Sequence, residues 1–244
     1  MGKLFVPYIM GNQKMIENLK LLEHYGADYV EIGIPFSDPV ADGPIIMEAG
    51  QEAIREGQTT DKILETLKQH RDHIKVPYIL MTYYHMIAVY GEDAFFKACT
   101  EAGVYGLIIP DLPYELLKQL KERHPNRKLK LISLISMTAN EARIENIAKE
   151  AEGFIYTVTM NAITGQDGAF HPELKEKIEF IKRHAKVPVM AGFGIKTPKD
   201  VKEIAATADG VVIGSEIVKR FKEGPDETTY QYLASIQAAL NESR

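Results

Sequence analysis

Three carboxylates fall close together where an apolar run gives way to a loop rich in proline and glycine. Glu31 lies between Val30 and Ile32, and Asp38 and Asp42 follow in the loop. A carboxyl group at the end of a buried strand is partly desolvated, which raises its pKa and suits it to give and take a proton near neutral pH. The spacing therefore predicts acid–base chemistry at the mouth of a pocket, with Glu31 as the proton-transfer group.

Each carboxylate also has a plainer interpretation. Glu31 could mark a strand end or pair with a lysine, since charged groups are seldom buried alone. Asp-Pro and Asp-Gly are common turn formers, and this interpretation fits Asp38 best. Asp42 precedes Gly43 and Pro44 near the expected start of a helix, so it could cap that helix or accept a hydrogen bond from a substrate N–H.

Two short glycine motifs lie near the C-terminus. One contains Gly192 and Gly194, and in the other Gly214 is followed by Ser215. Glycine lets backbone N–H groups come close to a ligand, and the N-terminus of a helix that begins at Ser215 favours an anion. Barrel enzymes often bind phosphate with the loops after strands seven and eight and a short extra helix, so we expect a phosphate site here, with residues 215–221 as that helix.

These groups need elements to position them, and short apolar runs alternate with longer amphipathic segments along the chain. Most of the runs are apolar on successive residues, which is typical of parallel strands buried on both faces. Strands are expected at residues 4–9, 28–32, 76–81, 105–109, 129–134, 154–158, 187–191 and 210–213. Helices are expected between them, at residues 14–25, 46–56, 61–73, 92–102, 115–124, 141–151, 172–184, 198–206 and 228–241.

Eight strands with intervening helices predict an α/β fold, the TIM barrel. A doubly wound open sheet is the main alternative, but residues 10–13 read Met-Gly-Asn-Gln and lack its glycine-rich first turn. No linker or change of composition indicates a second domain, so we expect one TIM-barrel domain over residues 1–244. In a barrel all loops that follow strands lie on one face, which would bring the carboxylates and the glycines together.

Composition and charge exclude several classes of function. The net charge of −5 disfavours nucleic acid or an anionic membrane as the main partner. Cys99 is the only cysteine and is expected to pack in a helix, and the histidines show no metal-ligand spacing, so no metal is predicted. The first ten residues, interrupted by Pro7, do not predict a signal peptide, and no apolar run approaches membrane-spanning length. We expect a cytoplasmic protein.

Residues 31–44, Glu-Ile-Gly-Ile-Pro-Phe-Ser-Asp-Pro-Val-Ala-Asp-Gly-Pro, closely resemble the signature of the tryptophan synthase α subunit family. Further segments resemble the family in the same order along essentially the whole chain, at residues 80–84, 106–113, 164–165, 192–195 and 213–215. The resemblance implies a carbon–carbon lyase of tryptophan biosynthesis, a TIM barrel that cleaves indole-3-glycerol phosphate to indole and glyceraldehyde 3-phosphate.

By this resemblance Glu31 is the general acid and base, and Asp42 holds the indole N–H. The phosphate of the substrate would bind the backbone around Gly165, Gly194, Gly214 and Ser215. The resemblance also implies a set of pocket-wall residues, namely Tyr8, Tyr83, Leu134, Tyr156 and Phe193. Thr164, in a long loop at residues 160–171 that could act as a lid, would help to orient the Asp42 loop on closure.

The resemblance implies a partner as well. The family works with a β subunit that carries pyridoxal phosphate and receives indole, in an α2β2 tetramer, whereas this chain needs no cofactor. The short segment before the first strand implies that a helix closing the bottom of the barrel is reduced or absent. Two alternatives remain open: another phosphate-binding barrel, such as a sugar-phosphate epimerase or isomerase, and a barrel that binds the phosphate ligand without turnover, as a regulatory or scaffolding subunit.

Overall fold

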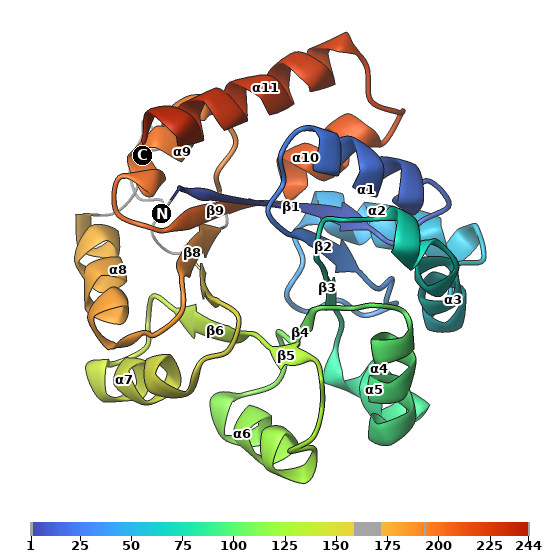
Figure 1. Cartoon of the computed structure of the whole chain (residues 1–244), viewed down its shortest axis with the longest axis horizontal. Helices are drawn as coiled ribbons and strands as arrows, with labels where there is room; N and C mark the ends of the chain where they lie inside the picture. The colour runs from blue at the N-terminus through green and yellow to red at the C-terminus, as the bar shows by residue number, and fades with distance from the viewer. Residues whose placement is uncertain (1, 159–171, 193, 244) are drawn as a thin grey trace. The chain divides into compact units, whose positions relative to one another are not determined.

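The computed structural model describes residues 2–158, 172–192 and 194–243, in which strands and helices alternate as the sequence predicts (Figure 1). The strands are β1 Leu4–Met10, β2 Val30–Gly33, β3 Tyr78–Met81, β4 Gly106–Ile108, β5 Lys130–Leu131, β6 Ser133–Ser136, β7 Ile155–Val158, β8 Val189–Gly192 and β9 Gly210–Ile213. The helices are α1 Met15–His24, α2 Pro44–Arg55, α3 Thr60–His70, the 3-10 turn η1 Arg71–His73, α4 Tyr84–Tyr90, α5 Glu92–Glu101, α6 Tyr114–Arg123, α7 Glu141–Glu150, α8 Pro172–His184, α9 Pro198–Ala205, α10 Ser215–Phe221 and α11 Glu227–Glu242.

The strands form a single sheet in the order β5-β4-β3-β2-β1-β9-β8-β7-β6. Each strand pair with a described register is parallel. All four residues of β2, of β8 and of β9 are buried, as are the last six of β1. This continuous burial explains the uninterrupted apolar runs in the sequence, because parallel strands between layers are covered on both faces.

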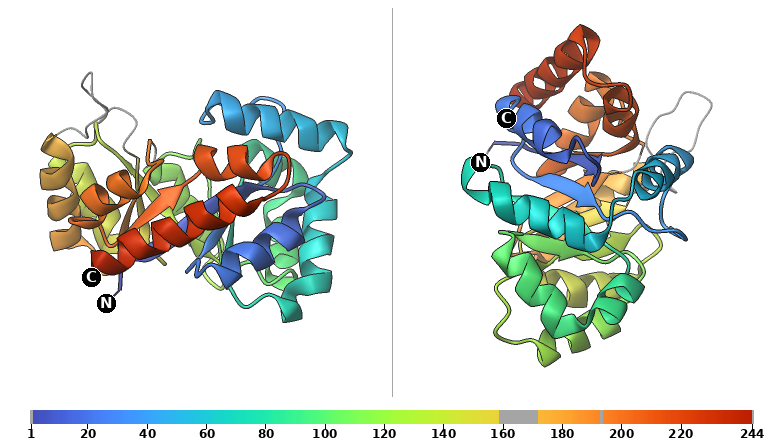
Figure 2. Two further views of the ribbon diagram at one scale, coloured as in Figure 1. Left: turned by 90° about the horizontal axis from the view of Figure 1, so that it is seen from above. Right: turned by 90° about the vertical axis from the view of Figure 1, so that its right-hand side faces the viewer.

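The chain divides into two compact units. Unit 1 comprises Met1–Val6, Ile132–Ile213 and Asp226–Arg244, and unit 2 comprises Pro7–Leu131 and Gly214–Pro225. In unit 1, α11 packs along α9 (Figure 2). In unit 2, α10 returns from late in the chain to lie against α2 (Figure 1), which brings the second glycine motif to the helix that follows the carboxylate loop.

The sequence missed one helix and wrongly predicted one strand. The missed helix is α4 at residues 84–90, where the Tyr84 N–H donates to Asp111 Oδ1 at 2.9 Å, a cap from a loop distant in sequence. The run at residues 129–134 is not one strand: β5 pairs with β4, whereas β6 pairs with β7. Within the described part of the chain, residues 2 and 3 precede β1 without helical structure.

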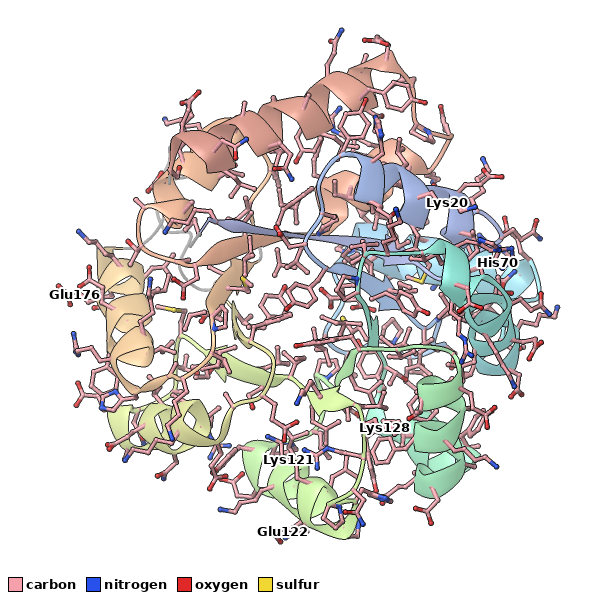
Figure 3. The ribbon with its side chains drawn as sticks, in the orientation of Figure 1. Lys20, His70, Lys121, Glu122, Lys128 and Glu176 are labelled. Carbon is pink, nitrogen blue, oxygen red and sulfur yellow. The ribbon has the colours of Figure 1, made fainter. Side chains whose placement is uncertain are left out.

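Charged side chains lie on the outer faces of the helices (Figure 3). Lys20 on α1 and Glu176 on α8 are both exposed and point away from the strands. The basic stretch at the end of α6 and after it has the same character, since Glu122 in the helix and Lys128 beyond it are exposed. This stretch is a solvated connection between a helix and a strand, as its composition indicates.

Candidate active site

Glu31 is a buried acid in the middle of the sheet. It lies on β2 with 2% of its surface exposed, in register with Tyr8 on β1 and Ile79 on β3. Strand neighbours in register present their side chains on the same face, so Glu31 faces apolar and aromatic groups. Burial raises the pKa of Glu31 to about 8, and the negative charge of Asp42 adds to the effect. At neutral pH Glu31 is therefore a carboxylic acid with a proton to give.

Tyr8 covers the strand just beyond this acid. A Cβ built on Gly33 would lie 1.8 Å from Tyr8 Oη and 2.6 Å from Tyr8 Cζ. The tyrosine ring therefore occupies the space that a side chain of residue 33 would take. Gly33 follows Glu31 by two residues and shares its face, so Tyr8 helps to exclude water from the carboxyl group.

Asp42 lies in the loop between β2 and α2 and is half-buried. Burial raises the pKa of Asp42 to about 6, and a hydrogen bond from the Tyr83 hydroxyl acts in the opposite direction. The N-cap of α2 is Gly43, which places Asp42 one residue before the cap and does not support a capping role. Asp38, by contrast, is exposed and accepts a hydrogen bond from Ser37 Oγ at 3.2 Å, as expected for a turn residue.

Helix α10 begins close to Tyr8, the register partner of Glu31. It spans Ser215–Phe221, the range expected from the sequence, and Gly214 is its N-cap. A Cβ on Gly214 would lie 3.5 Å from Ile46 Cδ1 and 3.8 Å from Tyr8 Cβ, so the N-terminus of α10 lies between β1 and the first turn of α2. The first N–H groups of a helix have no acceptor within the helix and can bind an anion. Unit 2 thus brings together Glu31, Asp42, Tyr8, Tyr83, Gly214 and Ser215.

Three further predicted site residues lie in unit 1. Leu134 on β6 and Tyr156 on β7 are in register, and Tyr156 extends over Gly192 on β8, where a Cβ would lie 2.4 Å from its ring. Gly194 is exposed and has a φ of 79°, a left-handed conformation that favours glycine. The remaining predicted residues, Thr164, Gly165 and Phe193, lie outside the described residues, as does the expected lid at residues 160–171.

Sequence reasoning missed the residues that hold Tyr83 in place. The Phe36 ring lies 5.1 Å from the Tyr83 ring, centroid to centroid, and the Ala41 N–H donates to Tyr83 Oη at 3.0 Å. Asp111 accepts the hydrogen bond of the Tyr84 N–H, which fixes the backbone directly after Tyr83. These contacts join loops far apart in sequence, so the sequence gives little sign of them. The one sign is that Asp111 lies in a turn flanked by prolines.

Other chemistries find little support in the described residues. Across residues 2–158, 172–192 and 194–243, no three His, Cys, Asp or Glu side chains form a group that could hold a metal ion. Cys99 is buried in α5, and burial raises the pKa of its thiol, which makes it a packing residue and not a nucleophile. None of the helices in this part of the chain combines the length and the apolar character needed to cross a bilayer.

Comparison with known proteins identifies the family. The family model described as tryptophan synthase alpha chain matches residues 1–243. The tryptophan synthase alpha chain of Staphylococcus aureus (strain JH9) is 62% identical over 241 residues, which cover 99% of this chain and all of the relative.

Solved structures agree over nearly the whole length. The tryptophan synthase subunit alpha of Legionella pneumophila (strain Paris) superposes with a TM-score of 0.86 at 32% identity, covering 98% of this chain and 93% of the other. A structure from Aquifex aeolicus VF5 gives a TM-score of 0.88 at 31% identity, with 98% and 94% covered. The predicted TIM-barrel fold class is thereby confirmed. The chain belongs to the tryptophan synthase alpha chain family, and it is a lyase that cleaves indole-3-glycerol phosphate to release indole.

Proposed function

We propose that Glu31 and Asp42 divide this cleavage between them, as a proton donor and an anion. The observation that carries the proposal is the burial of Glu31 next to a second, less buried carboxyl group. The pKa of Glu31 is about 8 and that of Asp42 about 6, so at pH 7 the first is protonated and the second is ionised. Two carboxyl groups whose environments separate their pKa values suit a reaction that needs an acid and an anion together.

The reaction is a retro-aldol cleavage. Glu31 gives its proton to the indole carbon that bears the glycerol chain, and positive charge develops on the ring nitrogen. Asp42 accepts the hydrogen bond of the indole N–H and stabilises that charge. The Glu31 carboxylate then takes the proton of the hydroxyl next to the breaking carbon–carbon bond, whose electrons flow into the ring. Indole and glyceraldehyde 3-phosphate leave, and Glu31 is protonated again.

The rest of the predicted residues bind the substrate. The phosphate is held by backbone N–H groups around Gly165, Gly194, Gly214 and Ser215. The start of α10 beside Tyr8 supports this assignment for the last two of these residues. The indole ring is enclosed by a wall of Tyr8, Tyr83, Leu134, Tyr156 and Phe193, and Thr164 orients the Asp42 loop. We expect these parts to act as one TIM-barrel domain over residues 1–244.

Membership of the family implies a β-subunit partner, and the alpha chains of the family bind no cofactor themselves. We extend this to an α2β2 tetramer in the cytoplasm, in which the β subunit carries pyridoxal phosphate and receives the indole. The net charge of −5 supports a small-molecule substrate and a protein partner over nucleic acid or membrane.

The test is an assay of indole release from indole-3-glycerol phosphate, with and without a tryptophan synthase β subunit. Glu31→Gln should lower turnover by about 10²- to 10⁴-fold, the range typical of a lost proton-transfer group. Asp42→Asn should lower it by about 10²- to 10³-fold, the range typical of a lost electrostatic partner of the transition state. Asp38→Asn, in the same loop but exposed, is the matched control and should keep the wild-type rate. Wild-type turnover by Glu31→Gln would refute the assignment, and substrate binding without turnover by the wild type would favour the non-catalytic alternative.

A further inference from the structure

The backbone around Tyr83 is held by the neighbouring strand and its loop. Tyr83 lies between β3 and α4, one residue after Thr82, and is 3% exposed. On one side of it the Thr82 N–H donates to Ile108 O at 3.0 Å. On the other side the Tyr84 N–H donates to Asp111 Oδ1 at 2.9 Å. The Tyr83 side chain therefore projects from a fixed point.

This fixed side chain touches both ends of the carboxylate loop. Its ring lies 5.1 Å from the Phe36 ring at an interplanar angle of 32°, and its hydroxyl oxygen accepts the Ala41 N–H at 3.0 Å. Phe36 and Ala41 flank the exposed part of the connection between β2 and α2, where Val40 is 81% exposed. One tyrosine thus anchors a loop that has few other contacts at its tip.

The Tyr83 hydroxyl has its own proton left to donate. The Ala41 N–H occupies one lone pair of the oxygen, and the Tyr83 O–H points to Asp42, with which it forms a hydrogen bond. Burial raises the pKa of Tyr83 to about 12, so the hydroxyl keeps its proton throughout the working range. A hydrogen bond to a carboxylate favours its charged form, which opposes the effect of burial on Asp42.

We propose that Tyr83 is a positioning residue, whose ring and hydroxyl hold the loop that carries Asp42 and keep its carboxylate ionised and directed at the indole N–H. This role goes beyond that of a pocket wall, and it rests on the proposed function of Asp42. Among the described residues, the titratable groups that face Asp42 are Glu31 from β2 and Tyr83 itself, and Asp111 faces Tyr83 from the loop after β4.

The test is Tyr83→Phe, which keeps the ring against Phe36 and removes both hydrogen bonds. With indole-3-glycerol phosphate as substrate, kcat should fall by about ten- to a hundredfold, the usual effect of losing a hydrogen bond to a charged group. The acid limb of the pH–rate profile should move to higher pH, because Asp42 loses the donor that favours its charged form. Tyr84→Phe is the matched control: its hydroxyl donates to Glu92 at 2.6 Å, so rate and profile should stay as in the wild type.

A second variant separates the ring from the hydroxyl. Phe36→Leu keeps the Tyr83 hydroxyl and removes the ring contact with Tyr83, together with the wider Phe36–His85 ring contact at 6.1 Å. It should lower kcat by a smaller factor without moving the acid limb. Wild-type kcat and an unmoved acid limb in folded Tyr83→Phe would overturn the inference, and so would an acid limb that moves equally in Phe36→Leu. If Glu31→Gln and Asp42→Asn are inactive while Tyr83→Phe has wild-type activity, the role of Tyr83 is refuted and the proposed function stands. If Glu31→Gln is active, the proposed function itself fails.

Discussion

The sheet contains one packing arrangement twice, once in each compact unit. In unit 2 the ring of Tyr8 extends over Gly33, and in unit 1 the ring of Tyr156 extends over Gly192. In both cases the glycine lies on the next strand, two residues beyond the register partner of the tyrosine. Each aromatic ring fills the space that a side chain at the glycine would take, so the two tyrosines pack in the same way.

The two arrangements differ in the residue that each tyrosine faces. Tyr8 is in register with Glu31, whereas Tyr156 is in register with Met190, and both partners are buried. A thioether is apolar and is readily buried, but burial of a carboxyl group strongly raises its pKa. The fold therefore supplies the enclosed position twice, and the residue type at one of the two positions makes it an acid.

Among variants that compare the two units, the largest effect should come from adding one methyl group to each glycine. Gly33→Ala forces Tyr8 Oη away from a clash at 1.8 Å and admits water to Glu31. We expect kcat to fall by about a hundredfold, with the alkaline limb of the profile moving to lower pH. Gly192→Ala displaces Tyr156 instead and should raise KM without moving either limb. Steady-state kinetics across pH decide this, and an equal shift of the alkaline limb in both variants would remove the distinction between the units.

The pH dependence of the wild type should report unit 2 alone. Asp42 must be ionised, so kcat should fall about tenfold per pH unit below its pKa of about 6. Glu31 must be protonated, so kcat should fall in the same way above its pKa of about 8. Met190→Leu should leave both limbs in place. A rate that stays flat from pH 5 to pH 9 would contradict the proposed division of roles.

Stability should respond in opposite directions to a glutamine placed in the two positions. The pKa of Glu31 is about 8 in the folded chain against an ordinary value of 4.5, so its contribution to stability is full below pH 4.5 and is lost as the pH rises toward 8. Glu31→Gln cannot ionise and should raise the free energy of unfolding by on the order of 2 kcal/mol at pH 7, and by little at pH 4.

Met190→Gln is the counterpart in unit 1. It buries an amide among apolar groups and should lower the free energy of unfolding by about 1–3 kcal/mol at both pH values. Urea denaturation at pH 4 and pH 7 measures both variants. If Glu31→Gln instead lowered the free energy of unfolding at pH 7, burial of the Glu31 carboxyl group would not destabilise the fold at that pH.

The smallest effects should come from the ion pairs that join helices within each unit. Lys222 after α10 contacts Glu48 on α2 at 2.8 Å, and Lys202 on α9 contacts Glu242 on α11 at 2.5 Å. Both pairs are exposed, so Lys222→Met and Lys202→Met should each change Tm by no more than about 2 °C. Only Lys222→Met should raise KM, by a small factor, because α10 bears the proposed phosphate site. An equal change of KM in both variants would contradict that placement.

Much of the scaffold could be predicted because its signals are local. The apolar runs marked the strands, and α10 began and ended where the glycine and the apolar residues around Ser215 indicated. The failures had long-range causes. Helix α4 depends on a cap from Asp111, and the split between β5 and β6 reflects a change of strand partner.

The candidate site shows the same division. The position of Glu31 on a buried strand could be predicted from its apolar neighbours, and the turn character of Asp38 from the proline after it. The interactions of Tyr83 could not be predicted, because the Ala41 N–H and the Phe36 ring reach it from a loop more than forty residues away. The roles of all these residues in binding and catalysis remain predictions for the experiments above.

The contact between Tyr8 and Gly33 also shows where the pocket could be re-engineered. The ring fills a space that the glycine leaves open, so the two positions are complementary in volume. A shorter side chain at position 8 would leave a hollow above β2, which a ring substituent of the substrate must fill to keep water away from Glu31. Residue 8 is therefore the place at which this lyase could be adapted to indoles that carry an extra ring substituent.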